Sequence, residues 1–191
     1  MQIILASTSP YRQQLLARLA VSFKTEAPEV DETPRPDEPA DELVTRLALA
    51  KARAVAKRYP QAVVIGSDQV AELDGRLLGK PGNRAAALDQ LTASSERCVC
   101  FFTAVAVCRH ASGHERVHLE PVRVHFRALS RAETLRYLEL EQPYDCAGSF
   151  KVEGLGISLF QSVESADPTS LEGLPLIALS AMLRELKLQV P

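Results

Sequence analysis

No apolar run in this chain approaches the length of a membrane-spanning helix, and no basic stretch followed by a hydrophobic one marks a leader at its start. Neither sign of charge prevails, because 22 basic and 24 acidic residues leave a formal net charge of −2. Such a balance provides no field that would attract nucleic acid or an anionic membrane. We therefore expect that the protein binds neither nucleic acid nor a membrane and that it is cytoplasmic. Any phosphate binding must rely on a few locally placed cations.

Metal-binding cysteine motifs are also missing. The four cysteines form no CxxC pair, and their pattern favours buried thiols in a reducing compartment. His110, His114 and His118 recur every four residues, but Ser112-Gly113 interrupts them, so a hairpin loop is favoured over a metal site.

The elements that are present alternate between strands and helices. An apolar fraction of 46% and a charged fraction of 24% are typical of a globular protein. Strands are predicted near 2–6, 21–26, 62–72, 97–109, 115–128 and 157–164, and helices near 10–20, 40–58, 82–94, 130–141 and 174–187. This order predicts an α/β fold, a mixed twisted sheet with flanking helices, in one domain over 1–191.

The first strand leads into a capped helix. Ser9 is a favoured N-cap and Pro10 a favoured first helical residue. A helix N-terminus presents free N–H groups and a positive dipole end, so Ser7, Ser9 and Arg12 could form a phosphate cradle. The alternative is an ordinary capped helix with a solvated arginine.

Three charges stand where the pattern favours apolar residues or turns. Lys51 shares a helical face with Leu43 and Leu47, so it either extends to the edge of that face or reaches a partner. Asp68 follows the apolar run 62–66; it either serves a metal or water at a strand end or caps a bend. Lys80, held extended by the following proline, is either an exposed hairpin lysine or a phosphate ligand.

The segment 27–39 is rich in proline and acid. It is either a solvated connection or a loop that carries carboxylates over a cleft, with Glu29, Asp31 and Glu32 as the candidates. In the second case its carboxylates could hold a divalent cation while the lysines and Arg12 neutralise a polyphosphate.

Seven motifs, in order and spacing, resemble the Maf family over nearly the whole chain. They are Leu5-Ala-Ser-x-Ser-Pro-x-Arg12, Glu29-Val-Asp-Glu32, Ala50-Lys51-Ala52, Gly66-x-Asp68, Leu78-Gly-Lys-Pro81, Ala147-Gly148 and Gly173-Leu-Pro175. The resemblance implies a nucleoside triphosphate pyrophosphatase that cleaves the α–β bond with a divalent cation (Mg²⁺, Mn²⁺ or Co²⁺). It also implies an elongated mixed α/β fold with a central cleft, related to the inosine triphosphatase architecture.

By position, the resemblance implies that Asp68 is the catalytic base and that Glu32 is paired with it around metal and water. Residues expected to hold the triphosphate are Ser7, Arg12, Lys51 and Lys80, and Ser9 belongs to the same cradle. A homodimer is compatible with the sequence.

Three substituted positions narrow the expected substrate. Tyr11, Gln69 and Glu153 replace an arginine, a threonine and a glutamine of the subgroup that acts on dTTP and UTP. The combination is similar to the YceF-like subgroup, which acts on 7-methyl-GTP, although that subgroup usually has tryptophan where Tyr11 stands. N7-methylation makes guanine cationic, which favours an aromatic face and a carboxylate. A dTTP or UTP pyrophosphatase and a nucleotide-binding regulator of septum formation remain the alternatives.

Overall fold

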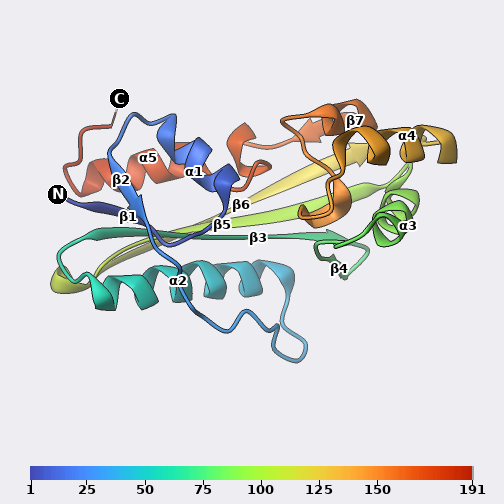
Figure 1. Cartoon of the computed structure of the whole chain (residues 1–191). Helices are drawn as coiled ribbons and strands as arrows, with labels where there is room; N and C mark the ends of the chain where they lie inside the picture. Colours follow the sequence, from blue (N-terminus) through green and yellow to red (C-terminus); the bar gives the residue numbers. More distant parts are fainter. Residues whose placement is uncertain (191) are drawn as a thin grey trace. The chain divides into compact units, whose positions relative to one another are not determined.

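A computed structural model describes residues 1–190 and shows one seven-stranded sheet with five α-helices (Figure 1). The strands are β1 (Ile3–Leu5), β2 (Phe23–Thr25), β3 (Val63–Leu73), β4 (Arg76–Leu78), β5 (Cys98–Arg109), β6 (His114–Phe126) and β7 (Phe160–Glu164). The helices are α1 (Pro10–Ala17), α2 (Ala40–Arg58), α3 (Arg84–Ser94), α4 (Arg131–Glu141) and α5 (Leu176–Glu185). The strand order is β2-β1-β3-β5-β6-β7, with β4 paired to β3.

The sheet is mixed. β1 runs parallel to both β2 and β3, whereas the pairs β3–β4 and β6–β7 are antiparallel. This confirms the expected α/β class. The chain divides into two compact units: the first contains 1–69, 103–120 and the residues from 167 onward, and the second contains 70–102 and 121–166. Whether 1–191 acts as one domain stays a prediction.

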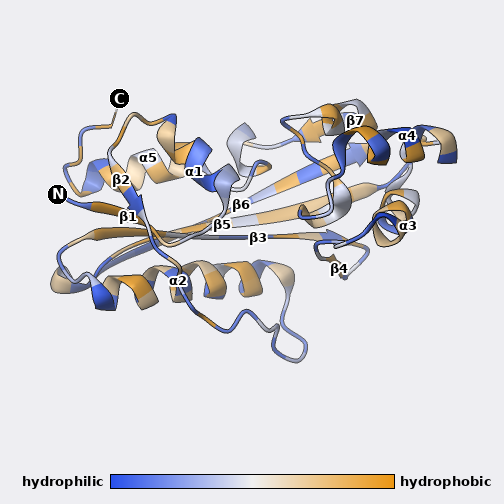
Figure 2. Cartoon of the chain, in the orientation of Figure 1, coloured by the Kyte–Doolittle hydropathy of each residue, from blue (hydrophilic) through white to orange (hydrophobic). Residues whose placement is uncertain are grey.

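The core of the first unit lies around β1 and β3. On one face, Ile3 and Leu5 pack with Val63 and Ile65, together with leucines of α1 and α5. Helix α2 covers the other face of these strands (Figure 1). Hydrophobic and hydrophilic residues alternate along α2 (Figure 2), which is the pattern of a helix with one buried side.

The second unit has an aromatic core. Phe101, Phe126, Phe150 and Phe160 pack edge to face, with ring centroids 4.8 to 5.8 Å apart in the four pairs. Burying these rings and their edge-to-face geometry both stabilise the unit.

Several boundaries differ from the sequence expectation. The first helix ends at Ala17 rather than near 20. The last strand begins at Phe160, because Leu155–Leu159 form a 3₁₀ helix, η3. All four cysteines are free, but only Cys108 is buried, so the expectation of buried thiols was wrong for the other three. Within residues 1–190, no helix is long and apolar enough to cross a membrane.

Gly66 allows β3 and α2 to approach at backbone distance. A Cβ at this position would lie 2.7 Å from the Ala52 nitrogen and would also overlap the Ala48 carbonyl oxygen. Both obstructing atoms belong to helix backbone, which cannot move aside without shifting α2. The glycine therefore sets the spacing between the strand that carries Asp68 and the helix that carries Lys51.

Gly66→Ala should lower the free energy of unfolding by about 3 kcal/mol, because overpacking forces α2 away from β3. Urea denaturation of the purified protein measures the loss. Gly79→Ala is the matched control, since a Cβ at Gly79 meets nothing within 4 Å. Equal stability of the two variants would contradict the close approach.

Candidate active site

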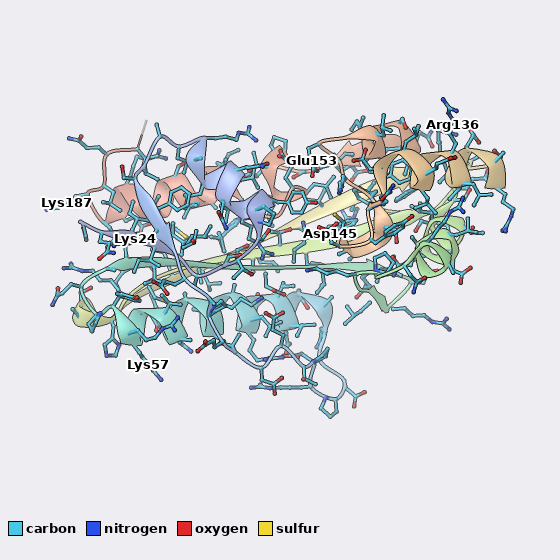
Figure 3. All side chains as sticks on the ribbon, in the orientation of Figure 1. Lys24, Lys57, Arg136, Asp145, Glu153 and Lys187 are labelled. Atoms are coloured by element: carbon cyan, nitrogen blue, oxygen red, sulfur yellow. The ribbon has the colours of Figure 1, made fainter. Side chains whose placement is uncertain are left out.

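Lys51 is buried on the inner side of α2. It lies in the same stripe as Leu43, Leu47 and Val55, and only 5% of the residue is exposed. By contrast, Lys57 on the same helix points away from the sheet (Figure 3). A buried ammonium is costly without a partner, so the position of Lys51 requires one.

The partners of Lys51 are two carboxylates. Its Nζ lies 2.6 Å from Oδ1 of Asp68 and 2.8 Å from Oε1 of Glu32. Of the two alternatives for Lys51, the structure therefore shows the partner. Asp68 lies in the middle of β3, so it neither ends the strand nor caps a bend. Its side chain is about as buried as that of Lys51, whereas the Glu32 side chain is 57% exposed.

Arg46 anchors the acidic loop that carries Glu32. Its guanidinium donates to both carboxylate oxygens of Glu38, at 2.5 and 2.7 Å, and to the carbonyl oxygen of Thr33 at 3.2 Å. The hydrogen bond from Arg46 lowers the pKa of Glu38 to about 2. Asp31 accepts a 2.9 Å hydrogen bond from the Thr33 amide, and its hydrogen bonds to Thr33 lower its pKa. These bonds order the loop and bring Glu32 to Lys51.

The role of Arg46 was not predicted from the sequence, because an arginine on a helix next to an acidic loop resembles any solvated cation. Of the three candidate carboxylates on this loop, Glu32 contacts Lys51. That the loop carries it over a cleft stays a prediction.

Arg12 is held by a backbone carbonyl from the far end of the chain. Its Nε donates to the Gly173 oxygen at 3.0 Å, and the hydroxyl of Ser67 donates to the same oxygen at 3.1 Å. Gly173 has a φ of 115°, a conformation that favours glycine. Within the described residues, the two terminal nitrogens of the Arg12 guanidinium make no hydrogen bond or ion pair, so they can bind an anion.

The segment that carries Gly173 is fixed by Asp167. One carboxylate oxygen accepts from the Thr169 amide at 2.9 Å, and the other accepts from the Ile177 amide at 2.7 Å near the start of α5. Asp167 and Ser67 were not among the residues predicted from the sequence. The glycine of Gly173-Leu-Pro175 was the one available signal, and it does not reveal which groups its carbonyl binds.

The start of α1 has the expected cap. The Ser9 hydroxyl accepts from the Arg12 amide at 3.4 Å, and the Ser7 hydroxyl accepts from the Ser9 amide at 3.1 Å. The capped helix is confirmed, whereas phosphate binding by Ser7, Ser9 and Arg12 stays a prediction.

The charges of Arg12, Asp68 and Glu32 interact. Burial lowers the pKa of the Arg12 guanidinium, and the two carboxylates oppose that shift. Arg12 and Lys51 thus place two cations beside two carboxylates in the first unit. This arrangement can bind an anionic substrate and accept a proton from water.

Gln69 is engaged with protein groups. Its Nε2 donates to the Thr103 hydroxyl at 3.0 Å and to the carbonyl oxygens of Ser170 and Leu171 at 2.9 and 3.2 Å. The amide therefore supports the segment before Gly173. Its Oε1 accepts no hydrogen bond from the described residues and stays available for a ligand.

The remaining predicted residues are divided between the units. Tyr11 lies in the first unit, on α1, whereas Lys80 and Glu153 lie in the second, and both of those are exposed. The segment before Lys80 is tied to α3 by a 3.1 Å hydrogen bond from Gln90 to the Gly79 oxygen. Substrate contact by Tyr11, Lys80 and Glu153 stays a prediction.

Asp68 and Glu32 also suit a divalent cation. Carboxylate oxygens are the ligands that Mg²⁺ and Mn²⁺ prefer. Among residues 1–190 there is no cluster of three or more His, Cys, Asp or Glu side chains able to hold a metal ion. A cation here would therefore take its other ligands from phosphate oxygens and water, as Mg²⁺ usually does with nucleotides.

Lys51→Met should lower the free energy of unfolding by about 3 kcal/mol, because it leaves the buried Asp68 carboxylate without its cation. Lys57→Met, an exposed change on the same helix, is the control for the loss of charge. The double variant Lys51→Met, Asp68→Leu should recover most of the stability, since an apolar pair can replace a buried ion pair. If the Lys51→Met protein is as stable in urea as the Lys57→Met control, the buried ion pair does not contribute to the stability of the fold.

The model of the Maf-like protein family matches residues 2–186. The 7-methyl-GTP pyrophosphatase of Xanthomonas oryzae pv. oryzae (strain MAFF 311018) is 57% identical over 192 residues, covering 100% of this chain and 99% of that protein. The protein of the same name from Pseudomonas savastanoi pv. phaseolicola is 53% identical over 189 residues, covering 99% and 98%.

A solved structure shows the same fold at much lower identity. The Staphylococcus aureus Ham1 protein is 14% identical, with a TM-score of 0.52 over 97% of this chain and 99% of that one. This likeness concerns the fold alone. The family match and the full-length relatives lead to one conclusion: the chain belongs to the Maf family.

Proposed function

We propose that this chain hydrolyses 7-methyl-GTP to 7-methyl-GMP and pyrophosphate, by attack of a metal-activated water on the α-phosphate. The observation that carries the proposal is the identity of more than half of all positions with full-length relatives named 7-methyl-GTP pyrophosphatase. The chain is accordingly a nucleotide pyrophosphatase, a hydrolase acting on acid anhydrides.

In the proposed mechanism, Asp68 is the general base. Its carboxylate accepts a proton from water, the water oxygen bonds to the α-phosphorus, and the α–β bond breaks to release pyrophosphate. Lys51 holds this carboxylate at 2.6 Å, so the base is oriented before substrate arrives. Asp68 and Glu32 would hold a divalent cation, which would supply a Lewis acid that lowers the pKa of water and offsets phosphate charge.

Arg12 is proposed to bind the phosphates. Its Nε is occupied by the Gly173 carbonyl, which fixes the direction of the guanidinium, and its terminal nitrogens remain for phosphate oxygens. Ser7, Ser9, Lys51 and Lys80 are proposed to share this task. Cations aimed at the departing pyrophosphate stabilise the charge that develops in the transition state.

Tyr11, Gln69 and Glu153 are proposed to select the base. A guanine methylated at N7 carries a positive charge, which a tyrosine ring face and a carboxylate both attract. Pyrimidines carry no such charge, which argues against dTTP and UTP.

Asp68→Asn should reduce turnover by a factor on the order of 10³ or more, because an amide cannot accept the proton. The variant keeps the shape of the side chain, and Lys51 keeps Glu32 as a partner, so the fold should persist. Pyrophosphate release and a thermal unfolding curve are measured on the same preparation. Retained turnover in a folded variant would overturn the assignment of the base.

Glu153→Gln should reduce the preference for 7-methyl-GTP over GTP about tenfold, the loss of one charge-assisted contact. The preference is the ratio of kcat/KM values for pyrophosphate release, measured with Mg²⁺, with Mn²⁺ and with neither. GTP, dTTP and UTP complete the substrate panel.

The panel also tests the proposed function in the unmodified protein. Faster pyrophosphate release from dTTP or UTP than from 7-methyl-GTP would contradict the assignment of 7-methyl-GTP as the substrate. Release of pyrophosphate without any added metal would contradict the proposed requirement for a divalent cation. No release from any nucleotide would favour the nucleotide-binding regulator.

A further inference from the structure

The turn that carries Glu153 has a tightly bonded backbone. It follows η2 (Ala147–Ser149) and leads into η3. The carbonyl oxygen of Lys151 accepts from two amides, that of Gly154 at 3.2 Å and that of Gly156 at 2.9 Å. These two hydrogen bonds hold the backbone on both sides of Glu153 in a tight turn.

Two side chains of α4 attach this turn to the helix. The Lys151 amide donates to the Tyr137 hydroxyl at 3.1 Å, and the Leu155 amide donates to Oε2 of Glu141 at 2.6 Å. Tyr137 and Glu141 are four residues apart and so lie on one face of the helix. Burial raises the pKa of Tyr137, which keeps its phenol neutral. Glu153 lies between the two attachment points and is labelled in Figure 3.

The position of Glu141 is unfavourable for a carboxylate in other respects. Glu141 is the last residue of α4, where the negative end of the helix dipole repels it. The hydrogen bond from Leu155 offsets that repulsion. Leu155 itself is 46% exposed, so its side chain packs only in part against the protein.

Gly154 leaves the space that Glu141 uses. A Cβ on Gly154 would lie 2.5 Å from Oε2 of Glu141 and 2.9 Å from its carboxyl carbon. Any side chain at 154 would therefore displace the carboxylate from the Leu155 amide. Glu141 thus supplies the hydrogen-bond acceptor, and Gly154 leaves the space that its carboxylate occupies.

Glu153 depends on this support. It is exposed, and within residues 1–190 it makes no hydrogen bond or ion pair of its own. The direction in which its Cα–Cβ bond leaves the chain is consequently set by the backbone of the turn.

We propose that Glu141 is a positioning residue for base selectivity, which holds the turn 151–156 so that Glu153 meets the base in one orientation. This rests on the proposed function, since Glu153 selects the base there. Glu141 itself touches no substrate.

Glu141→Ala should reduce the preference for 7-methyl-GTP over GTP about tenfold, the effect of one lost hydrogen bond to a charged group. The variant should raise KM for 7-methyl-GTP and change kcat by less than about twofold, because it weakens binding of the ground state and of the transition state equally. Glu141→Gln, which keeps an acceptor oxygen, should restore most of the preference. Hydrogen exchange of the turn 151–156 should become faster in Glu141→Ala.

Two further variants make the test specific. Glu139→Ala removes an exposed carboxylate from the same helix and should leave the preference unchanged. Gly154→Ala should reproduce the loss of preference for 7-methyl-GTP, because the flexible Glu141 side chain moves aside while the fold persists. If Glu141→Ala folds poorly, the Gly154→Ala variant tests the proposal in its place. An unchanged preference in Gly154→Ala or Glu141→Ala, or an equal fall of kcat on every nucleotide, would overturn the proposal.

The same panel separates this inference from the proposed function. If the unmodified protein prefers a base other than 7-methylguanine, the proposed substrate fails, and Glu141 is judged by whether that other preference is lost. If the unmodified protein discriminates among no bases, a role in selectivity is overturned as well.

Discussion

The buried ammonium of Lys51 is the group on which the first unit depends. It is out of water, so it must have anions within reach, and it has two. Each neighbouring feature serves this arrangement. Gly66 lets the helix come close enough to the strand, and Arg46 holds the acidic loop so that Glu32 arrives from the other side. A cation placed between two carboxylates also orients both of them when no substrate is bound.

The sequence was sufficient for the individual parts of this cluster. Lys51 interrupts an apolar stripe with a period of four, and Asp68 interrupts an apolar strand, so each is visible as an exception to a simple pattern. The alternation of strands and helices likewise predicted the mixed sheet. Within one strand, the alternate residues Val122, Val124 and Phe126 are all buried. Local periodicity carries such information because it reflects which side of an element faces the core.

The partners of these residues could not be predicted in the same way. Whether Lys51 meets Asp68 depends on how closely a helix packs on a strand, which is a property of the tertiary structure. The acceptor for Arg12 is a backbone carbonyl, and a carbonyl has no side chain that a sequence could reveal. The loop 27–39 looked unstructured because of its prolines and acids, but hydrogen bonds within the loop and from Arg46 on α2 order it. Gln69 was predicted as a specificity position from its substitution, and the sequence did not reveal that its amide nitrogen also supports a neighbouring segment.

The bond between Arg12 and the Gly173 carbonyl joins residues 161 positions apart. A ribosome releases the chain from its N-terminus, so Arg12 and Ser67 leave it long before their common acceptor exists. Until the segment from Asp167 to Ile177 has emerged, nothing fixes the guanidinium that is proposed to hold the phosphates. The orientation of Arg12 is therefore coupled to the synthesis of that segment: a growing chain that already contains Lys51, Asp68 and Glu32 still lacks the carbonyl that holds Arg12.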